Sequence, residues 1–505
     1  MTFAFRAITA AAAVAALAGT TFAQFTGPSS SQSPYLLPAA SGVSTTSILT
    51  VGDSIGGYRM VGIPDGLGAF AHPGGGAFTL VMNHELQGTA GIARAHGQTG
   101  AFVSRWSINN DLTVTSGRDH NTSAADAYEY NSTTGAWSNA PSAAQRWSRF
   151  CSGDLAGATA FYNPASGAGT QSRIYLNGEE NGAEGRAYAH ILTGSAANQT
   201  WQLPSLGRFS WENSVANSYA QQKTLVMGMD DSTPGEVYMY IGNKTTTGND
   251  IERAGLTNGN LYGIAVQGLA TEGRGAAAAG RFNMVSQGNV TNSTGAQLQT
   301  SSSASNVTKF LRPEDGAWDP RPGHENEFYF VTTDRYNQPG QQGNSRLYKM
   351  TFDDINNPEN GGTITSLVDG FFAGPQMMDN ICVDTHGRIL IQEDIGGNNA
   401  LGKVWLFDTN TNNLGVIAQH DAARFGVGGA NFLTNDEEAS GIIDAKDILG
   451  DGWYLLDVQA HYGISGELVE GGQLLAMYVD PSIVPAPGAL ALLGAGGLFA
   501  ARRRR

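Results

Sequence analysis

The stretch Asp379-Asn-Ile-Cys-Val-Asp-Thr-His-Gly-Arg-Ile-Leu-Ile391 runs from a turn into a short strand, through an Asp-x-x-Gly turn, and into a second strand. Residues 312–333 follow the same order. β-Propellers repeat such units, four strands at a time, around a central channel. A two-sheet sandwich is the competing fold, but the chain contains more short strands than one sandwich uses. The pattern therefore predicts an all-β protein, and a β-propeller in particular.

Short segments rich in β-branched and aromatic residues, each flanked by Gly, Asn or Asp, recur along the chain. Two stretches rich in Gly, Ser and Thr are instead predicted to be long surface loops without a firm helix, at 115–140 and 275–305. The predicted strands are 78–82, 172–176, 236–241, 346–351, 388–391, 403–407, 453–456 and 473–478.

The composition narrows the function classes. The chain has 505 residues, 67 of them Gly, and a formal net charge of -15. No basic face is visible in its body, which argues against nucleic acid as a partner. The acidity either keeps a secreted protein soluble or is reversed locally by bound metal ions.

The N-terminus has the pattern of an export signal. Arg6 precedes an Ala-rich apolar run, and the small residues Thr21 and Ala23 stand before Gln24 as a signal peptidase requires. Residues 1–23 are therefore predicted to be a signal peptide, with a short buried helix as the alternative. The protein is expected to be exported to the periplasm, the cell surface or the medium.

The C-terminus, 484–505, reads Val-Pro-Ala-Pro, then a short apolar run, then Arg502 to Arg505. The apolar run is shorter than a comfortable membrane helix, and the arginines would stop at the cytoplasmic face. This segment resembles a PEP-CTERM sorting signal, although the usual glutamate is missing. The resemblance implies processing by an exosortase-type enzyme and a transient or anchored membrane contact; a plain membrane anchor is the alternative.

Arg312 and Glu314 are the first candidate site residues. An extended Arg-x-Glu segment places both side chains on one face. A guanidinium holds a phosphate as a fork, and a neighbouring carboxylate binds a hard metal ion. The pair therefore suggests a metal-dependent site for an anionic ester, with a surface ion pair as the alternative.

Further acidic residues stand where turns meet strands. Carboxylates at the ends of several strands can converge on a propeller channel, where they repel one another unless cations neutralise them. Calcium suits such oxygen-rich cages, and a thiolate adds a preference for a transition metal. A solvated turn is the alternative for any single one of them. The clusters are Asn83-His84-Glu85, Cys151 to Asp154, Glu179-Glu180, Gly207 to Asn213, Asp230-Asp231, Glu393-Asp394 and Asp436 to Gly441.

The order of these phrases resembles the PhoX-type alkaline phosphatase family, from about Gly52 to Val479. The resemblance implies a six-bladed propeller over 24–480 that hydrolyses phosphate monoesters with iron (Fe³⁺) and calcium ions in its channel. Its matching phrases are Asp65 to Gly68, Asn83 to Glu85, Cys151 with Glu179-Glu180, Gly207 to Glu212, Arg312 to Glu314, Asp379 to Gly387, Glu438 to Gly441, and Val458, Gln459 and His461.

The resemblance also assigns roles. Arg312 would hold the oxygens of the phosphate ester. Cys151 would be a thiolate ligand to iron, although a buried apolar thiol or a disulfide with Cys382 is the alternative for this residue. The implied carboxylate ligands are Glu180, Glu212, Glu314 and Glu438.

Some positions depart from the family pattern. The segment after Cys151 lacks the usual Gly-Gly-Thr-Pro-Trp, Trp211 replaces a histidine, and the Gln-His-Pro phrase is broken at Ala460. These departures keep two other functions open. One is a non-catalytic, metal-stabilised surface propeller for binding or coat structure, and the other is a calcium-dependent lactone or ester hydrolase.

Overall fold

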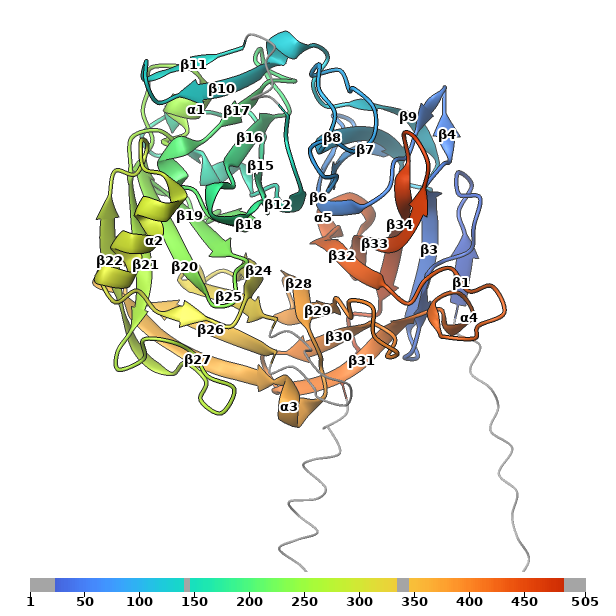
Figure 1. Ribbon diagram of the computed structural model, residues 1–505. Coiled ribbons are helices and arrows are strands. Elements are labelled where there is room, and N and C mark those ends of the chain that lie inside the picture. Colours follow the sequence, from blue (N-terminus) through green and yellow to red (C-terminus); the bar gives the residue numbers. More distant parts are fainter. Residues whose placement is uncertain (1–22, 140–145, 334–344, 486–505) are drawn as a thin grey trace, which may run out of the picture.

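Six blades of mainly antiparallel strands surround a central axis (Figure 1), so the predicted β-propeller is confirmed. The computed structural model describes residues 23–139, 146–333 and 345–485. The innermost strand of each blade contacts the innermost strands of both neighbouring blades, which closes the ring. These six strands are β6 (Pro64–Ala71), β12 (Phe150–Asp154), β18 (Trp211–Ala216), β24 (Pro313–Trp318), β28 (Met378–Val383) and β32 (Glu437–Asp444).

The first three blades come from the first half of the chain. Blade one continues from β6 through β7 (Ala77–His84), β8 (Phe102–Asn109) and β9 (Val114–Asp119). Blade two continues from β12 through β15 (Ile174–Glu179), β16 (Ala187–Ile191) and β17 (Thr200–Gln202), with β10 (Ala127–Asn131) and β11 (Ala136–Ser138) at its edge. Blade three continues from β18 through β19 (Lys223–Asp230), β20 (Gly235–Asn243), β21 (Asn260–Val266) and β22 (Gly280–Gly288).

The other three blades follow in chain order. Blade four continues from β24 through β25 (Glu327–Thr332), β26 (Arg346–Phe352) and β27 (Gly362–Asp369), and β27 also pairs with β22. Blade five continues from β28 through β29 (Arg388–Glu393), β30 (Lys403–Asp408), β31 (Asn413–His420) and β2 (Leu36–Pro38). Blade six continues from β32 through β33 (Trp453–Ile464), β34 (Val469–Val479), β3 (Val43–Thr50) and β1 (Ala23–Thr26).

Blade six joins the two ends of the described chain. Its three inner strands come from the C-terminal part, whereas β3 comes from the N-terminal part and pairs antiparallel with β34, Val43 opposite Val479. This pairing joins the N-terminal and C-terminal parts of the described chain within one blade. The remaining short elements are β4 (Ser54–Ile55), β5 (Tyr58–Arg59), β13 (Tyr162–Asn163), β14 (Ala168–Gly169), β23 (Lys309–Phe310), α1 (Asp250–Arg253), α2 (Gly295–Ala304), α3 (Gly370–Ala373), α4 (Ala422–Phe425) and α5 (Lys446–Leu449).

The hydrophobic core is divided among the interfaces between blades. Separate clusters lie between blades one and two, two and three, and so on around the ring to six and one. Each blade therefore buries both of its faces, which explains why strands such as β20, β28 and β29 are buried along nearly their whole length. This packing holds the innermost strands rigidly around the axis.

All eight predicted strand segments overlap strands of the structure. The two predicted loops are wrong in part. Residues 115–140 contain most of β9 and the pair β10 and β11, and residues 275–305 contain β22 and the ten-residue helix α2. A capping box starts this helix: the Thr294 hydroxyl accepts from the Gln297 amide, and the Gln297 side chain accepts from the Thr294 amide. The high Ser and Thr content of the segment concealed this signal.

Most of the two predicted targeting segments lies outside the described residues, which begin at Ala23 and end at Pro485. No helix in the described part is long and apolar enough to cross a membrane. Gln24, the predicted first residue of the mature chain, lies in β1 opposite Thr45.

Candidate metal centre

One residue in each blade occupies the same place at the start of the innermost strand. It is always the second residue of that strand, and all six positions lie at the same end of the channel. Five are carboxylic acids and one is a thiol. We call these residues the inner ring: Asp65, Cys151, Glu212, Glu314, Asp379 and Glu438.

A second set of equivalent positions lies on the neighbouring strand of each blade. In every blade the first residue of the innermost strand pairs with a residue of the second strand. The residue that follows this partner in the chain lies at the same end of the channel as the inner ring. Four of the six are carboxylic acids. We call these residues the outer ring: Glu85, Glu180, Asp231, Thr333, Asp394 and His461.

The backbone around the inner ring is irregular in a repeated way. Every innermost strand has a register shift against its neighbour next to the inner-ring residue. Bulges of this kind bend a strand and redirect its side chains. In four blades the residue two positions before the inner ring also has a left-handed backbone, which is costly outside glycine. These residues are Ile63, Arg149, Arg312 and Met377, with φ angles of 50°, 53°, 63° and 48°.

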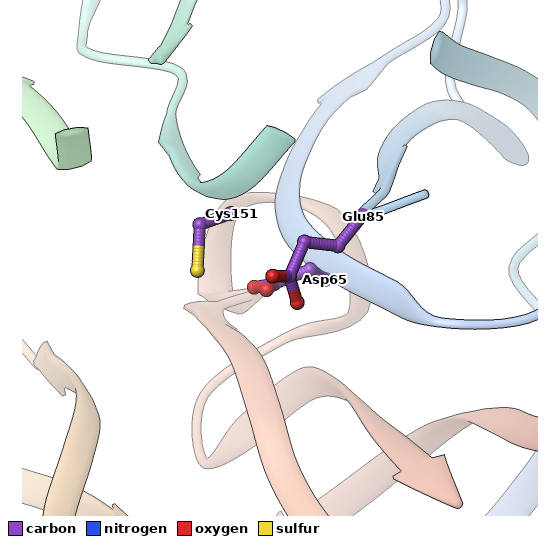
Figure 2. A group of neighbouring side chains, drawn as sticks. All are labelled: Asp65, Glu85 and Cys151. Atoms are coloured by element: carbon purple, nitrogen blue, oxygen red, sulfur yellow. The ribbon is translucent and has the colours of Figure 1, made fainter. Parts of the chain in front are cut away.

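Three groups of potential metal ligands overlap on these rings. In each group the ligand atoms lie within 4.8 Å of one another. Figure 2 shows the first group, in which the carboxylates of Asp65 and Glu85 lie together beside the Cys151 thiol. Because neighbouring groups share Cys151 or Glu212, they form one continuous arc across four blades. The groups are Asp65–Glu85–Cys151, Cys151–Glu180–Glu212 and Glu212–Asp231–Glu314.

Burial in this arc opposes charge. It raises the pKa of Glu212 to about 8, with the Asp231 carboxylate adding to the effect. Burial also raises the pKa of Asp65 and of Glu314 well above the ordinary range, and further carboxylates contribute. For the Cys151 thiol, burial and then the Asp65 carboxylate raise the pKa. Without cations the arc therefore retains protons that a bound metal ion would displace.

The residues present fit metal ions of two kinds. Glu314 is fully buried, and Arg312 Nε lies 2.8 Å from its Oε1, but neither of its side-chain oxygens accepts a well-formed hydrogen bond from the described residues. A buried carboxylate that is incompletely paired is costly, and a coordinated cation removes that cost. Convergent carboxylates suit calcium or ferric iron, and the Cys151 thiol adds a ligand that favours a transition metal.

Arg312 lies beside this arc. Its Nε donates to Asp231 Oδ1 at 2.6 Å, its Nη2 donates to Asp231 Oδ2 at 3.2 Å, and its Nε is 2.8 Å from Glu314 Oε1. The side chain is only 16% exposed, so this is not a surface ion pair. The extended conformation expected at Arg312 is wrong, because the residue has a left-handed backbone and precedes β24.

Glu438 lies on the inner ring but outside the three groups. Its Oε1 accepts from the Ser440 hydroxyl at 2.9 Å, and its Oε2 is 3.9 Å from His461 Nε2. His461 in turn contacts Glu470, at 2.6 Å from Nδ1. A backbone bridge joins Glu438 to Asp394 of the preceding blade. The structure thus places Glu438 in a second sector of the rings, beside carboxylates and one histidine.

The predicted site residues Cys151, Glu180, Glu212 and Glu314 all lie on the arc, with Arg312 in contact. The sequence indicates Asp65 and Asp379 only as parts of motifs, and their equivalent positions become visible only when the strands are aligned. Arg149 was missed, although it precedes Cys151 by two residues as Arg312 precedes Glu314. That shared spacing is a signal in the sequence.

Trp211 and His84 have structural roles, and the two cysteines are not bonded to each other. Trp211 is buried and stacks on Phe209, with ring centroids 3.9 Å apart. His84 is fully buried between the Gly62 carbonyl and the Ser104 hydroxyl. Cys151 and Cys382 are both free and buried, so they do not form the disulfide that the sequence left open.

Comparisons with known proteins agree with the fold. Residues 195–442 match the family model described as alkaline phosphatase PhoX. This range includes Glu212, Arg312 and Glu438 but not Cys151. No curated protein matches the chain.

One similar solved structure is Pseudomonas fluorescens PhoX in complex with vanadate, a transition state analogue. The similarity covers 92% of this chain and 99% of the PhoX chain. Its TM-score is 0.59 at 13% sequence identity, which supports a shared propeller fold. The catalytic domain of Coprinopsis cinerea GH62 α-L-arabinofuranosidase covers 91% of this chain and 96% of its own, at 10% identity and a TM-score of only 0.34.

Proposed function

We propose that this protein is an exported, metal-dependent phosphomonoesterase of the PhoX type. The observation that carries the proposal is the arc of buried ligand groups with the Arg312 guanidinium in contact with it. The arc provides sites for cations, and the guanidinium provides a partner for the oxygens of a phosphate. The family match over 195–442 and the likeness to a vanadate-bound propeller support this assignment.

Iron and calcium are the proposed cofactors, held by Cys151, Glu180, Glu212, Glu314 and Glu438. When bound, these ions supply the positive charge that stabilises the phosphoryl group and the attacking and leaving oxygens. Asp65, Glu85 and Asp231 complete the three ligand groups.

Arg312 has the geometry of a residue that binds and orients substrate. Asp231 holds its Nε and Nη2 edge, so the guanidinium is fixed before any ligand arrives. Among the described residues, none accepts a hydrogen bond from its Nη1, which leaves two N–H donors for phosphate oxygens. A guanidinium fixed in this way loses little entropy on binding, and its charge-assisted hydrogen bonds are strong.

The test is hydrolysis of an aryl phosphate by residues 24–485 loaded with iron and calcium. We expect turnover that chelation abolishes and that Arg312→Ala lowers by about 100-fold or more, as for loss of one preorganised charge-stabilising donor. Arg321→Ala is the matched control, because Arg321 pairs with Asp319 beyond the other end of β24. Turnover that is equal in the wild-type and Arg312→Ala proteins would reject the proposal.

The same proposal includes export and sorting. Cleavage before Gln24 and processing of 484–505 by an exosortase-type enzyme would deliver the propeller to the periplasm or the cell surface, where it would release phosphate from esters. Mass spectrometry of the protein from its native host would identify both ends. An intact segment 1–23 in the mature protein would contradict export by this route.

A further inference from the structure

Arg149 occupies in blade two the position that Arg312 occupies in blade four. Each arginine stands two residues before the inner ring and has a left-handed backbone, with φ of 53° and 63°. Each Nε donates to the outer-ring carboxylate of the preceding blade. The Arg149 bond goes to Glu85 Oε1 at 2.7 Å, and the Arg312 bond goes to Asp231 Oδ1 at 2.6 Å.

Both guanidinium groups also use Nη2, but on different kinds of partner. Nη2 of Arg149 donates to Glu180 of its own blade, whereas Nη2 of Arg312 donates to Asp231, the same carboxylate that accepts from its Nε. In the part of the chain that the structure describes, neither Nη1 forms a hydrogen bond. Arg149 is the more accessible of the two, since 34% of its side chain is exposed against 16% for Arg312.

Both guanidinium groups pair with carboxylates of the rings, and those carboxylates are neighbours. Glu180 and Asp231 belong to adjacent ligand groups that share Glu212. Arg149 forms ion pairs with Glu85 and Glu180, and Arg312 forms ion pairs with Asp231 and Glu314.

We propose that Arg149 is a second phosphate-binding residue, which makes the site prefer phosphate monoesters to diesters. The inference rests on the proposed function. A monoester dianion offers three non-bridging oxygens, whereas a diester offers two. With Arg312 on one oxygen and cations on another, the free Nη1 of Arg149 takes the third, which a diester lacks. A structural residue that only neutralised Glu85 and Glu180 would not distinguish the two substrates.

The experiment compares the wild-type protein with Arg149→Lys, which keeps the charge but loses the fork, and with Arg149→Met. Three measurements are made on metal-loaded protein: metal content, the dissociation constant for inorganic phosphate by calorimetry, and kcat and KM for an aryl phosphate and an aryl methyl phosphate. Arg321→Lys serves as the control for the loss of a paired arginine away from the rings.

We expect both Arg149 variants to retain their metal and to bind inorganic phosphate about 10- to 100-fold more weakly, as for one charge-assisted hydrogen-bonding group. The value of kcat/KM for the monoester should fall by a similar factor, mainly through KM, and that for the diester should hardly change. Equal losses for both esters, or a loss that follows metal content, would overturn the inference.

The outcomes also separate this inference from the proposed function. If the wild-type protein hydrolyses neither ester but binds phosphate in an Arg149-dependent way, the proposed function fails and the binding role of Arg149 stands. If the protein is an active phosphatase whose phosphate affinity is unchanged in Arg149→Lys, the function stands and the inference fails.

Discussion

The two ends of the channel both bury carboxylates, but they stabilise them differently. At the ring end, carboxylates face one another and the Cys151 thiol within 4.8 Å. At the opposite end, the innermost strands line a cavity of about 270 Å³ that contains Asp154, Asp315, Asp444 and the Cys382 thiol. None of the described residues that line this cavity is basic.

Backbone amides stabilise the carboxylates of the cavity. Asp154 accepts from the Ala216 amide at 3.0 Å, and Asp444 accepts from the Lys446 amide at 2.9 Å. Asp315 accepts from the amides of Gly316 and Ile381 and from the Asn213 side chain. Glu314, one residue before Asp315, instead lies 2.8 Å from Arg312 Nε and accepts no hydrogen bond from a backbone amide among the described residues. The two ends therefore differ in arrangement: at the ring end several acids and a thiol converge within 4.8 Å, whereas in the cavity separate backbone amides hold each acid.

The two cysteines provide the largest expected contrast. Cys151→Ala should reduce bound iron and lower phosphatase activity by at least about 100-fold, because it removes an atom shared by two ligand groups. Cys382→Ala should leave metal content and activity near those of the wild-type protein. Elemental analysis and aryl phosphate turnover measure both. Unchanged iron in Cys151→Ala would refute the ligand assignment.

Metal removal should lower the stability of the protein through the loss of contacts at the ring end. Chelation is expected to lower the free energy of unfolding by about 3 kcal/mol relative to protein at a hundredfold excess of ion over its Kd. The loss should be larger at pH 8 than at pH 5, because protonated ring acids such as Glu212, whose pKa is raised to about 8, repel one another less at pH 5. Denaturant unfolding with and without chelator measures this. An identical response at both pH values would contradict it.

Asp315→Ala should destabilise the protein by about 2 kcal/mol even after chelation, because it leaves buried donors of Asn213, Gly316 and Ile381 without an acceptor. Asp315→Asn retains one acceptor oxygen and is the matched control with a smaller loss. Chemical denaturation of chelated protein measures both. Equal stability of Asp315→Ala and the wild-type protein would show that these bonds contribute little.

The smallest effect concerns Asp154. Burial raises its pKa from the ordinary value of 3.8 to about 7. The folded protein thus binds a proton that the unfolded chain releases, so this group costs stability as pH rises from about 4 to about 7. Asp154→Asn should therefore stabilise the protein at pH 8 and hardly at pH 4. Unfolding curves at pH 4 and pH 8 measure the stabilisation. Equal stabilisation at the two pH values would show that it has another cause.

The sequence alone determined the strands and several of the acids. Short apolar segments between turn residues predict β-structure because their periodicity and flanking residues are local properties. Cys151, Glu212 and Glu314 could be selected because each stands in a short phrase that resembles a phrase of the PhoX-type family. Arg149 offered the same spacing as Arg312, but nothing local showed that its guanidinium would meet Glu85.

Only the tertiary structure decided which acids converge. Glu85, Cys151 and Asp231 are far apart in the chain, and the closure of six blades brings them to one end of the channel. The register shift beside each inner-ring residue sets the direction of its side chain, and strand pairing rather than composition produces that shift. The same register shift spans Glu314, which lies on the ring, and Asp315, which accepts backbone amides.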